Sequence, residues 1–271
     1  MKLFLCFTFA AVFSQNSPAQ FLYNETDARA SSMGGAFASL NNGSSAVFCN
    51  PAGLGSLNHN GASVFFEPAL YGLSEITTAA LTYAQSFGFA NFGIGLRTFG
   101  FDLYRESKLV LTAGGSSGDN IRWGLSAVAY NVAVKSYGSA FAFGLDAGIQ
   151  ADIGEMFTWG FTAKNITGAR IGESGQKISR SYSTGIGVNP SENGFIMIEV
   201  EKETWGAVNV RFGGEFNPVK PLFIRAGISS EPVSYSAGIG VVYGIVGFDY
   251  AAVVTDPLGL TNKFELIFAL H

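Results

Sequence analysis

The chain has 271 residues, of which 48% are hydrophobic and only 13% are charged, with 25 Phe, 35 Gly and 8 Pro. Soluble domains usually carry about 25% charged residues, and a net charge of −4 lacks the basic surface that nucleic-acid binding needs. The composition therefore argues against an ordinary soluble domain and against a nucleic-acid partner, while the length fits a single barrel-sized domain.

The first segment, residues 1–19, has the pattern of a secretory signal peptide. A basic start is followed by an apolar run over residues 3–13 and by the small-residue cleavage site Ser17-Pro18-Ala19, with a second possible site after Ser14. We expect the mature chain to begin near Gln20. No later window approaches the roughly 18 unbroken apolar residues that a membrane helix requires.

The stretch from Asp27 to Leu57 differs from everything after it because small residues dominate it. Met33 and Phe37 are spaced four residues apart, which places them on one apolar stripe if the segment is helical. A polar turn and a second short helical run follow, and Asn50-Pro51 ends that run because proline disfavours helix in the preceding residue. We predict that residues 20–60 form a plug that the rest of the chain encloses.

The motifs in this stretch resemble the N-terminal hatch of the FadL superfamily of outer-membrane barrels, most closely its short PorV/PorQ-type members. They read Ala28-Arg29-Ala30, then Met33, Gly34, Gly35, Ala36 and Phe37, and finally Asn50, Pro51, Ala52, Gly53 and Leu54. Two departures stand out. Asn41 and Asn42 replace acidic residues that are frequent in the family, and Cys49 replaces an aromatic residue before the second motif.

From residue 61 onward the apolar residues alternate with small or polar ones, which is typical of strands with two different faces. In residues 141–153, for example, Phe, Leu, Ala and Ile alternate with Ala, Gly, Asp and Gln. About fourteen such runs start near residues 62, 76, 90, 106, 119, 140, 156, 178, 194, 206, 221, 232, 244 and 261. Alternate turns are tight, whereas residues 168–177 and 255–260 are longer and should lie outside the cell. The pattern predicts an all-β fold: a closed antiparallel transmembrane barrel over residues 61–271.

The predicted lumenal face carries charged residues that we expect to meet the polar groups of the plug: Arg97, Arg122, Asp146, Arg211, Glu215, Arg225 and Asp249. The alternative is that these residues are solvated near the strand ends. Arg180 is in phase with the lipid-facing residues, so we expect it near a rim, where a charge costs little.

Catalytic and cofactor-binding groups are scarce. His59 and His271 are the only histidines, so no triad or histidine metal cluster can be assembled, and we predict neither enzyme activity nor a cofactor. Glu199, Glu201 and Glu203 place three carboxylates on one strand face. A bound cation is one interpretation, and a solvated lumenal face is the one we favour.

Three hypotheses for function follow. The resemblance favours a non-catalytic barrel of the bacterial outer membrane that serves type IX protein secretion or surface attachment, with secretion-system proteins as partners. A FadL-like passive channel for small hydrophobic molecules, such as long-chain fatty acids, is the alternative. Both barrels would have membrane lipid around them. The third hypothesis is a secreted β-sandwich, whose apolar faces would pack on each other.

Overall fold

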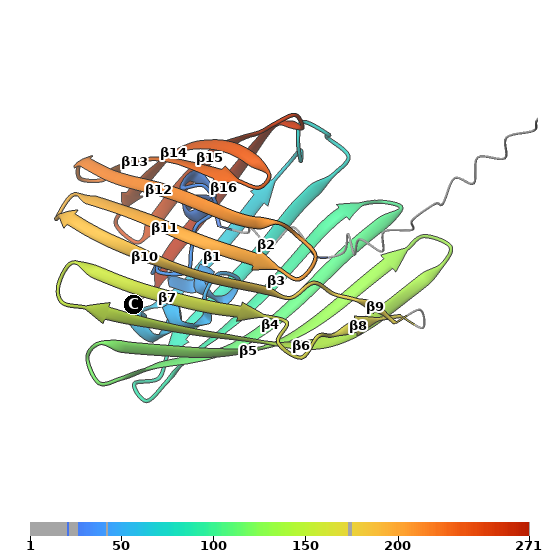
Figure 1. Cartoon of the computed structure of the whole chain (residues 1–271), viewed down its shortest axis with the longest axis horizontal. Helices are drawn as coiled ribbons and strands as arrows, with labels where there is room; N and C mark the ends of the chain where they lie inside the picture. Colours follow the sequence, from blue (N-terminus) through green and yellow to red (C-terminus); the bar gives the residue numbers. More distant parts are fainter. Residues whose placement is uncertain (1–20, 22–26, 42, 173–174, 271) are drawn as a thin grey trace, which may run out of the picture.

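The computed structural model describes residues 21, 27–41, 43–172 and 175–270, so the predicted signal peptide lies outside the described residues. Fourteen strands close into one antiparallel barrel (Figure 1). They are β1 Asn60–Glu67, β2 Thr77–Ser86, β3 Asn91–Phe101, β4 Tyr104–Ser117, β5 Ile121–Val134, β6 Gly138–Ile153, β7 Phe157–Lys164, β10 Ser181–Ser191, β11 Gly194–Glu203, β12 Val208–Val219, β13 Leu222–Ser230, β14 Val233–Tyr243, β15 Val246–Thr255 and β16 Gly259–Leu270.

Each predicted strand start lies within three residues of the observed one. A short hairpin, β8 Arg170–Ile171 with β9 Gln176–Lys177, was not expected and lies in the long connection between β7 and β10. We call the end of the barrel where β1 begins and β16 ends the inner end, and the opposite end the outer end. Some outer connections, such as 101–104 and 230–233, are as short as the inner turns, so the predicted alternation of loop lengths holds only for the connections 67–77 and 164–181.

The two faces of the wall differ as the alternation predicts. In β6, Phe141 and Phe143 are 63% and 75% exposed on the outside, whereas Ala142 and Asp146 are buried on the lumenal side. A closed wall that is apolar outside and internally hydrogen-bonded suits a bilayer, because hydrocarbon satisfies no backbone polar group. The β-sandwich hypothesis is wrong, since the apolar faces point outward and do not pack on each other. Among the described residues, no helix has the length and apolarity needed to cross a bilayer.

The described residues between Asp27 and β1 form three short helices inside the barrel: α1 Ala28–Ser32, η1 Gly43–Val47 and η2 Pro51–Ser56 (blue in Figure 1). The α1 helix lies against β13–β16 and η2 against β3–β6. The expected helical stripe through Met33 and Phe37 does not form, because Gly34 and Gly35 adopt φ of 73° and 75° and end the helix. Both side chains are nevertheless buried.

Candidate functional site

The plug is in direct contact with a series of glycines on the lumenal face of the wall. A Cβ atom added to Gly148 would lie 1.9 Å from Asn50 Oδ1, one on Gly160 would lie 1.9 Å from the Ala38 carbonyl oxygen, and one on Gly124 would lie 2.2 Å from the Pro51 carbonyl carbon. Seven more wall glycines would bring a Cβ within 3.0 Å of plug atoms: Gly93, Gly95, Gly114, Gly187, Gly213, Gly227 and Gly238. The small lumenal residues therefore hold the plug closely and leave little free space around it.

The start of the plug is fixed by carboxylates. Asp27 is the N-cap of α1 and accepts a hydrogen bond from Ala30 N–H at 2.6 Å, while Glu265 of β16 accepts from Ala28 N–H at 2.8 Å. Ser45 Oγ of η1 donates to the other oxygen of Glu265 at 2.6 Å, so one wall carboxylate joins two plug helices. Burial raises the pKa of Asp27 to about 6, although the hydrogen bond from Ala30 opposes the shift.

Three of the predicted lumenal residues form one ion-pair network with the plug. Arg29 Nη2 lies 2.7 Å from Glu215 Oε1, and Arg225 donates both to Glu215 and, at 2.6 Å, to Asp249 Oδ1. Arg225 is 4% exposed and Asp249 is equally buried. Removing one member of such a buried network leaves its partners charged and uncompensated, which is costly.

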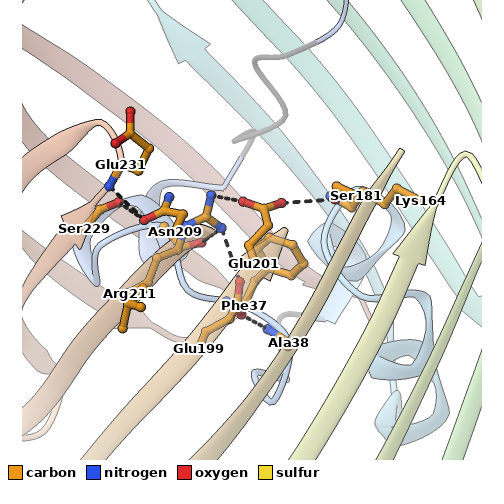
Figure 2. Close-up of polar contacts among 12 residues, drawn as sticks. Phe37, Ala38, Lys164, Ser181, Glu199, Glu201, Asn209, Arg211, Ser229 and Glu231 are labelled. Atoms are coloured by element: carbon orange, nitrogen blue, oxygen red, sulfur yellow. Dashed lines mark hydrogen bonds and ion pairs between the residues drawn. The ribbon is translucent and has the colours of Figure 1, made fainter. Parts of the chain in front are cut away.

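The middle of the plug, residues 36–41, has no helix or strand, and polar side chains of the wall hold its backbone (Figure 2). Glu199 Oε2 accepts from Phe37 N–H at 2.8 Å and from Ala38 N–H at 2.6 Å. Arg211 donates to the Gly35 carbonyl oxygen at 2.9 Å and also pairs with Glu199 and Glu201. We call residues 36–41 the flap.

The second motif of the plug is fixed by Asn50. Its side chain accepts from Ala52 N–H at 3.1 Å, as the N-cap of η2, and donates to the Ala38 carbonyl oxygen at 2.6 Å. Pro51 then occupies the first turn of η2, where its missing N–H costs nothing. Ala52 and Leu54 are fully buried. This motif therefore joins the flap to η2.

The remaining predicted lumenal charges make other contacts. Arg122 pairs with Asp152 at 2.6 Å, and Asp146 accepts from Asn165 N–H at 2.7 Å in the connection after β7. Arg97 is 3% exposed and lies over the Phe99 ring, and its Nε and Nη2 have no hydrogen-bond partner among the described residues.

Sequence reasoning missed several of the residues that hold the plug. Gln150 donates to the Ala38 and Leu40 carbonyl oxygens, Asn91 donates to that of Leu54, and Lys164 donates to that of Phe48. Each of these residues falls on the lumenal side of the alternation in its strand, and this was the one feature of the sequence that could have identified it. The row of carboxylates was anticipated, but Glu199 and Glu201 pair with Arg211, and within the described ranges no group of three or more His, Cys, Asp or Glu could hold a metal ion.

Two cavities lie on opposite sides of the plug. The outer cavity, of about 410 Å³, opens towards the outer end, and its lining includes Phe37, Phe99, Glu201, Arg211 and Val253. The inner cavity, of about 200 Å³, lies at the inner end and is lined by Arg29, Ser39, Leu40 and Asn41 of the plug together with wall residues of the inner turns.

Solved structures with the same fold include toluene transporters and a FadL homologue. The Ralstonia pickettii toluene transporter TbuX aligns over 93% of this chain and 100% of its own, with a TM-score of 0.71 and 13% identity. The Pseudomonas putida toluene transporter TodX aligns over 92% and 99%, at 0.67 and 12% identity. A Pseudomonas aeruginosa FadL homologue aligns over 91% and 99%, at 0.67 and 10% identity.

The sequence by itself matches no protein-family model and no curated protein. At identities of 10% to 13%, the likeness to the solved structures establishes a shared fold. The chain therefore shares the closed-barrel fold of these solved structures, and in this chain residues 27–41 and 43–59 lie inside the barrel.

Proposed function

We propose that the protein is a passive channel in the bacterial outer membrane that takes up small hydrophobic molecules. The apolar outer face supports a membrane location, and a predicted signal peptide supports export. The inner end then faces the periplasm, because the mature chain would enter and leave the barrel there. The outer cavity faces the medium.

The observation that carries this proposal is the outer cavity above a closed plug. Its volume of about 410 Å³ falls within the range of about 300–1,000 Å³ that is usual for small-molecule sites. Phe37, Phe99, Pro232 and Val253 supply apolar surface. A cavity of this size can hold one small hydrophobic molecule and is too small for a folded protein domain.

The alternative of a PorV/PorQ-type secretion protein has less support. The solved structures that share the fold include transporters for toluene, and these favour uptake of a small molecule over protein secretion. The outer connections, most of which are short, are compatible with a small channel.

The experiment compares uptake of radiolabelled toluene and of a radiolabelled long-chain fatty acid in a deletion strain that expresses the wild type or a variant. Val253→Trp fills the outer cavity from its lining, whereas Val254→Trp adds the same ring one residue away, on the outer face, where Val254 is 48% exposed. We expect Val253→Trp to lower uptake about tenfold, equivalent to about 1.4 kcal/mol, and Val254→Trp to leave uptake unchanged.

Heat-modifiable gel mobility checks that both variants fold as barrels. If uptake of both compounds is the same with and without the protein, the channel proposal is wrong. If secreted cargo then accumulates in the periplasm of the deletion strain, the secretion role replaces it.

A further inference from the structure

A row of hydroxyl groups on β13, β14 and β15 faces the outer cavity. Ser229, Ser234 and Thr255 are directly opposed across these strands, and the Cβ atoms of such neighbours lie about 4.5–5.5 Å apart. All three line the cavity, and each is less than a tenth exposed. Ser229 Oγ donates to Asn209 Oδ1 at 2.8 Å, whereas the hydroxyls of Ser234 and Thr255 have no hydrogen-bond partner among the described residues. Because a buried hydroxyl without a partner is costly, both can bind a polar group that enters the cavity.

A carboxylate lies just beyond the outer end of this row. Glu231 belongs to the turn between β13 and β14 and also lines the outer cavity. Asn209 Oδ1 fixes the turn, because it accepts from the N–H groups of Ser230 at 3.2 Å and of Glu231 at 3.1 Å (Figure 2). Within the described ranges the Glu231 carboxylate forms no ion pair. The turn therefore holds an uncompensated negative charge next to the two hydroxyls that have no partner.

The charges around the outer cavity favour a cation. The described residues that line it include more carboxylates than cations, namely Glu106, Glu201, Glu203 and Glu231 against Arg211 and Lys263. Both cations already face carboxylates: Arg211 pairs with Glu199 and Glu201, and Lys263 Nζ lies 3.7 Å from Glu67 Oε2. Neither lining cation is therefore left to neutralise the carboxylate of the β13–β14 turn. A cavity with surplus negative charge attracts cations and disfavours anions.

The same cavity offers apolar surface for the rest of a ligand. Phe37, Phe99 and Val253 line it, and Val253 lies two residues before Thr255 on the same face of β15. The two rings already carry cations, since Lys164 Nζ lies 4.4 Å from the centroid of Phe37 and the Arg97 guanidinium 5.6 Å from that of Phe99. A ligand would therefore place its uncharged part on the rings and its charged end at the β13–β14 turn.

We propose that the outer cavity selects hydrophobic molecules that carry a protonated amine, whose ammonium group is held by Glu231, Ser234 and Thr255. An ammonium group has three N–H donors, which matches one carboxylate and two hydroxyl acceptors. Phe37 and Val253 contact the apolar part of the ligand. This inference rests on the proposed function, because it concerns the same cavity, and it narrows the substrate class from small hydrophobic molecules to amphipathic amines.

The test compares four molecules that share one benzene ring and differ in the group attached to it: toluene, benzyl alcohol, benzylamine and benzoate. Their binding to the purified barrel in detergent micelles is measured by isothermal titration calorimetry at pH 7, where benzylamine is protonated, and partition into empty micelles is subtracted. We expect benzylamine to bind about tenfold more tightly than toluene or benzyl alcohol, because its hydrogen bonds are charge-assisted, and benzoate to bind most weakly.

Substitutions test whether the named residues provide the selectivity. Glu231→Gln removes the charge and keeps the shape of the side chain, so the ratio of benzylamine affinity to toluene affinity should fall about tenfold. Ser234→Ala combined with Thr255→Val should also lower this ratio. The matched control is Glu192→Gln, which makes the same change at an exposed carboxylate of the inner end and should keep the wild-type ratio.

Heat-modifiable gel mobility checks that each variant folds. A wild type that binds benzylamine no better than toluene, an equal affinity for benzyl alcohol and benzylamine, or a Glu231→Gln protein with the wild-type ratio would each overturn the proposal.

Uptake in the deletion strain separates the failure of this inference from the failure of the channel proposal. If the protein takes up toluene but binds benzylamine no better, the amine selectivity is wrong and the channel stands. If benzylamine binds through Glu231 while uptake of toluene, fatty acid and benzylamine is the same with and without the protein, the amine site stands and the channel proposal is wrong.

Discussion

The close fit between plug and wall can be tested by adding one methyl group at Gly34. This residue has φ of 73°, and an added Cβ would lie 2.4 Å from the carbonyl oxygen of Ile228 in β13. Gly43 is the matched control, because its φ is 56° and an added Cβ would have nothing within 4 Å. Both substitutions by Ala introduce left-handed strain, and only Gly34→Ala adds a collision with backbone.

The magnitude follows from these two contributions. A non-glycine residue in the left-handed region costs about 1–2 kcal/mol, which applies to both variants. Overpacking against a wall that cannot yield adds about 1–3 kcal/mol at Gly34. The difference between the variants should therefore be about 2 kcal/mol in favour of plug release, or about a 30-fold larger released population.

The assay is limited proteolysis of the plug in the folded barrel, followed over time at fixed protease, because cleavage tracks the population of the open form when reclosing is fast. We expect Gly34→Ala to be cleaved within residues 27–57 much faster than Gly43→Ala, with intact heat-modifiable mobility in both. Equal cleavage rates would show that β13 does not restrain the plug at this point.

Three further predictions concern the polar contacts. The pKa of Asp27 is raised from 3.8 to about 6 in the docked plug, so the docked state binds a proton that the released state loses. Docking of the plug should therefore weaken by about 3 kcal/mol as the pH rises from about 4 to above 6. The rate of plug proteolysis should rise over this pH range, and Asp27→Asn should remove that pH dependence. Asn50→Ala should speed plug cleavage by the loss of a cap and of a buried hydrogen bond, about 1–3 kcal/mol, whereas exposed Asn58→Ala should not. Arg225→Met leaves Glu215 and Asp249 buried without their shared cation and should cost about 3–5 kcal/mol, visible as a lower denaturant midpoint than for exposed Arg105→Met.

The wall could be predicted from the sequence because one local rule governs it. Neighbouring residues of a strand point to opposite faces of the wall, so Phe143 is large and apolar on the outer face and Gly144 is small on the lumenal face. This alternation was enough to locate the strands. The hairpin β8–β9 was not predicted, because strands of two residues are too short to show an alternation of apolar and polar residues. Its position is set by long-range burial of Ile171 and Ile178 against the inner face of the wall, which no local pattern reports.

The plug was harder to predict in detail. The spacing of Met33 and Phe37 fits a helix, but Gly34 and Gly35 take left-handed angles that satisfy contacts with β13 and β14, including the bond from Gly34 N–H to Ser236 Oγ at 2.9 Å. Which lumenal charge meets which plug group also depends on the stagger of distant strands. The alternation placed Glu215 and Arg225 on the lumenal face. It could not show that Glu215 pairs with Arg29 or that Arg225 pairs with Asp249, because those pairs depend on the three-dimensional arrangement of the strands.

The bond between Ala28 and Glu265 joins residues 237 positions apart, and its consequence concerns biogenesis. Ala28 is synthesised long before Glu265, its partner on the last strand of the barrel, so α1 can dock fully only after the barrel has closed. A chain that lacks β16 would lose one strand of the barrel. It would also lose the Glu265 carboxylate, which holds α1 and η1 of the plug together, so we expect its lumen to stay open.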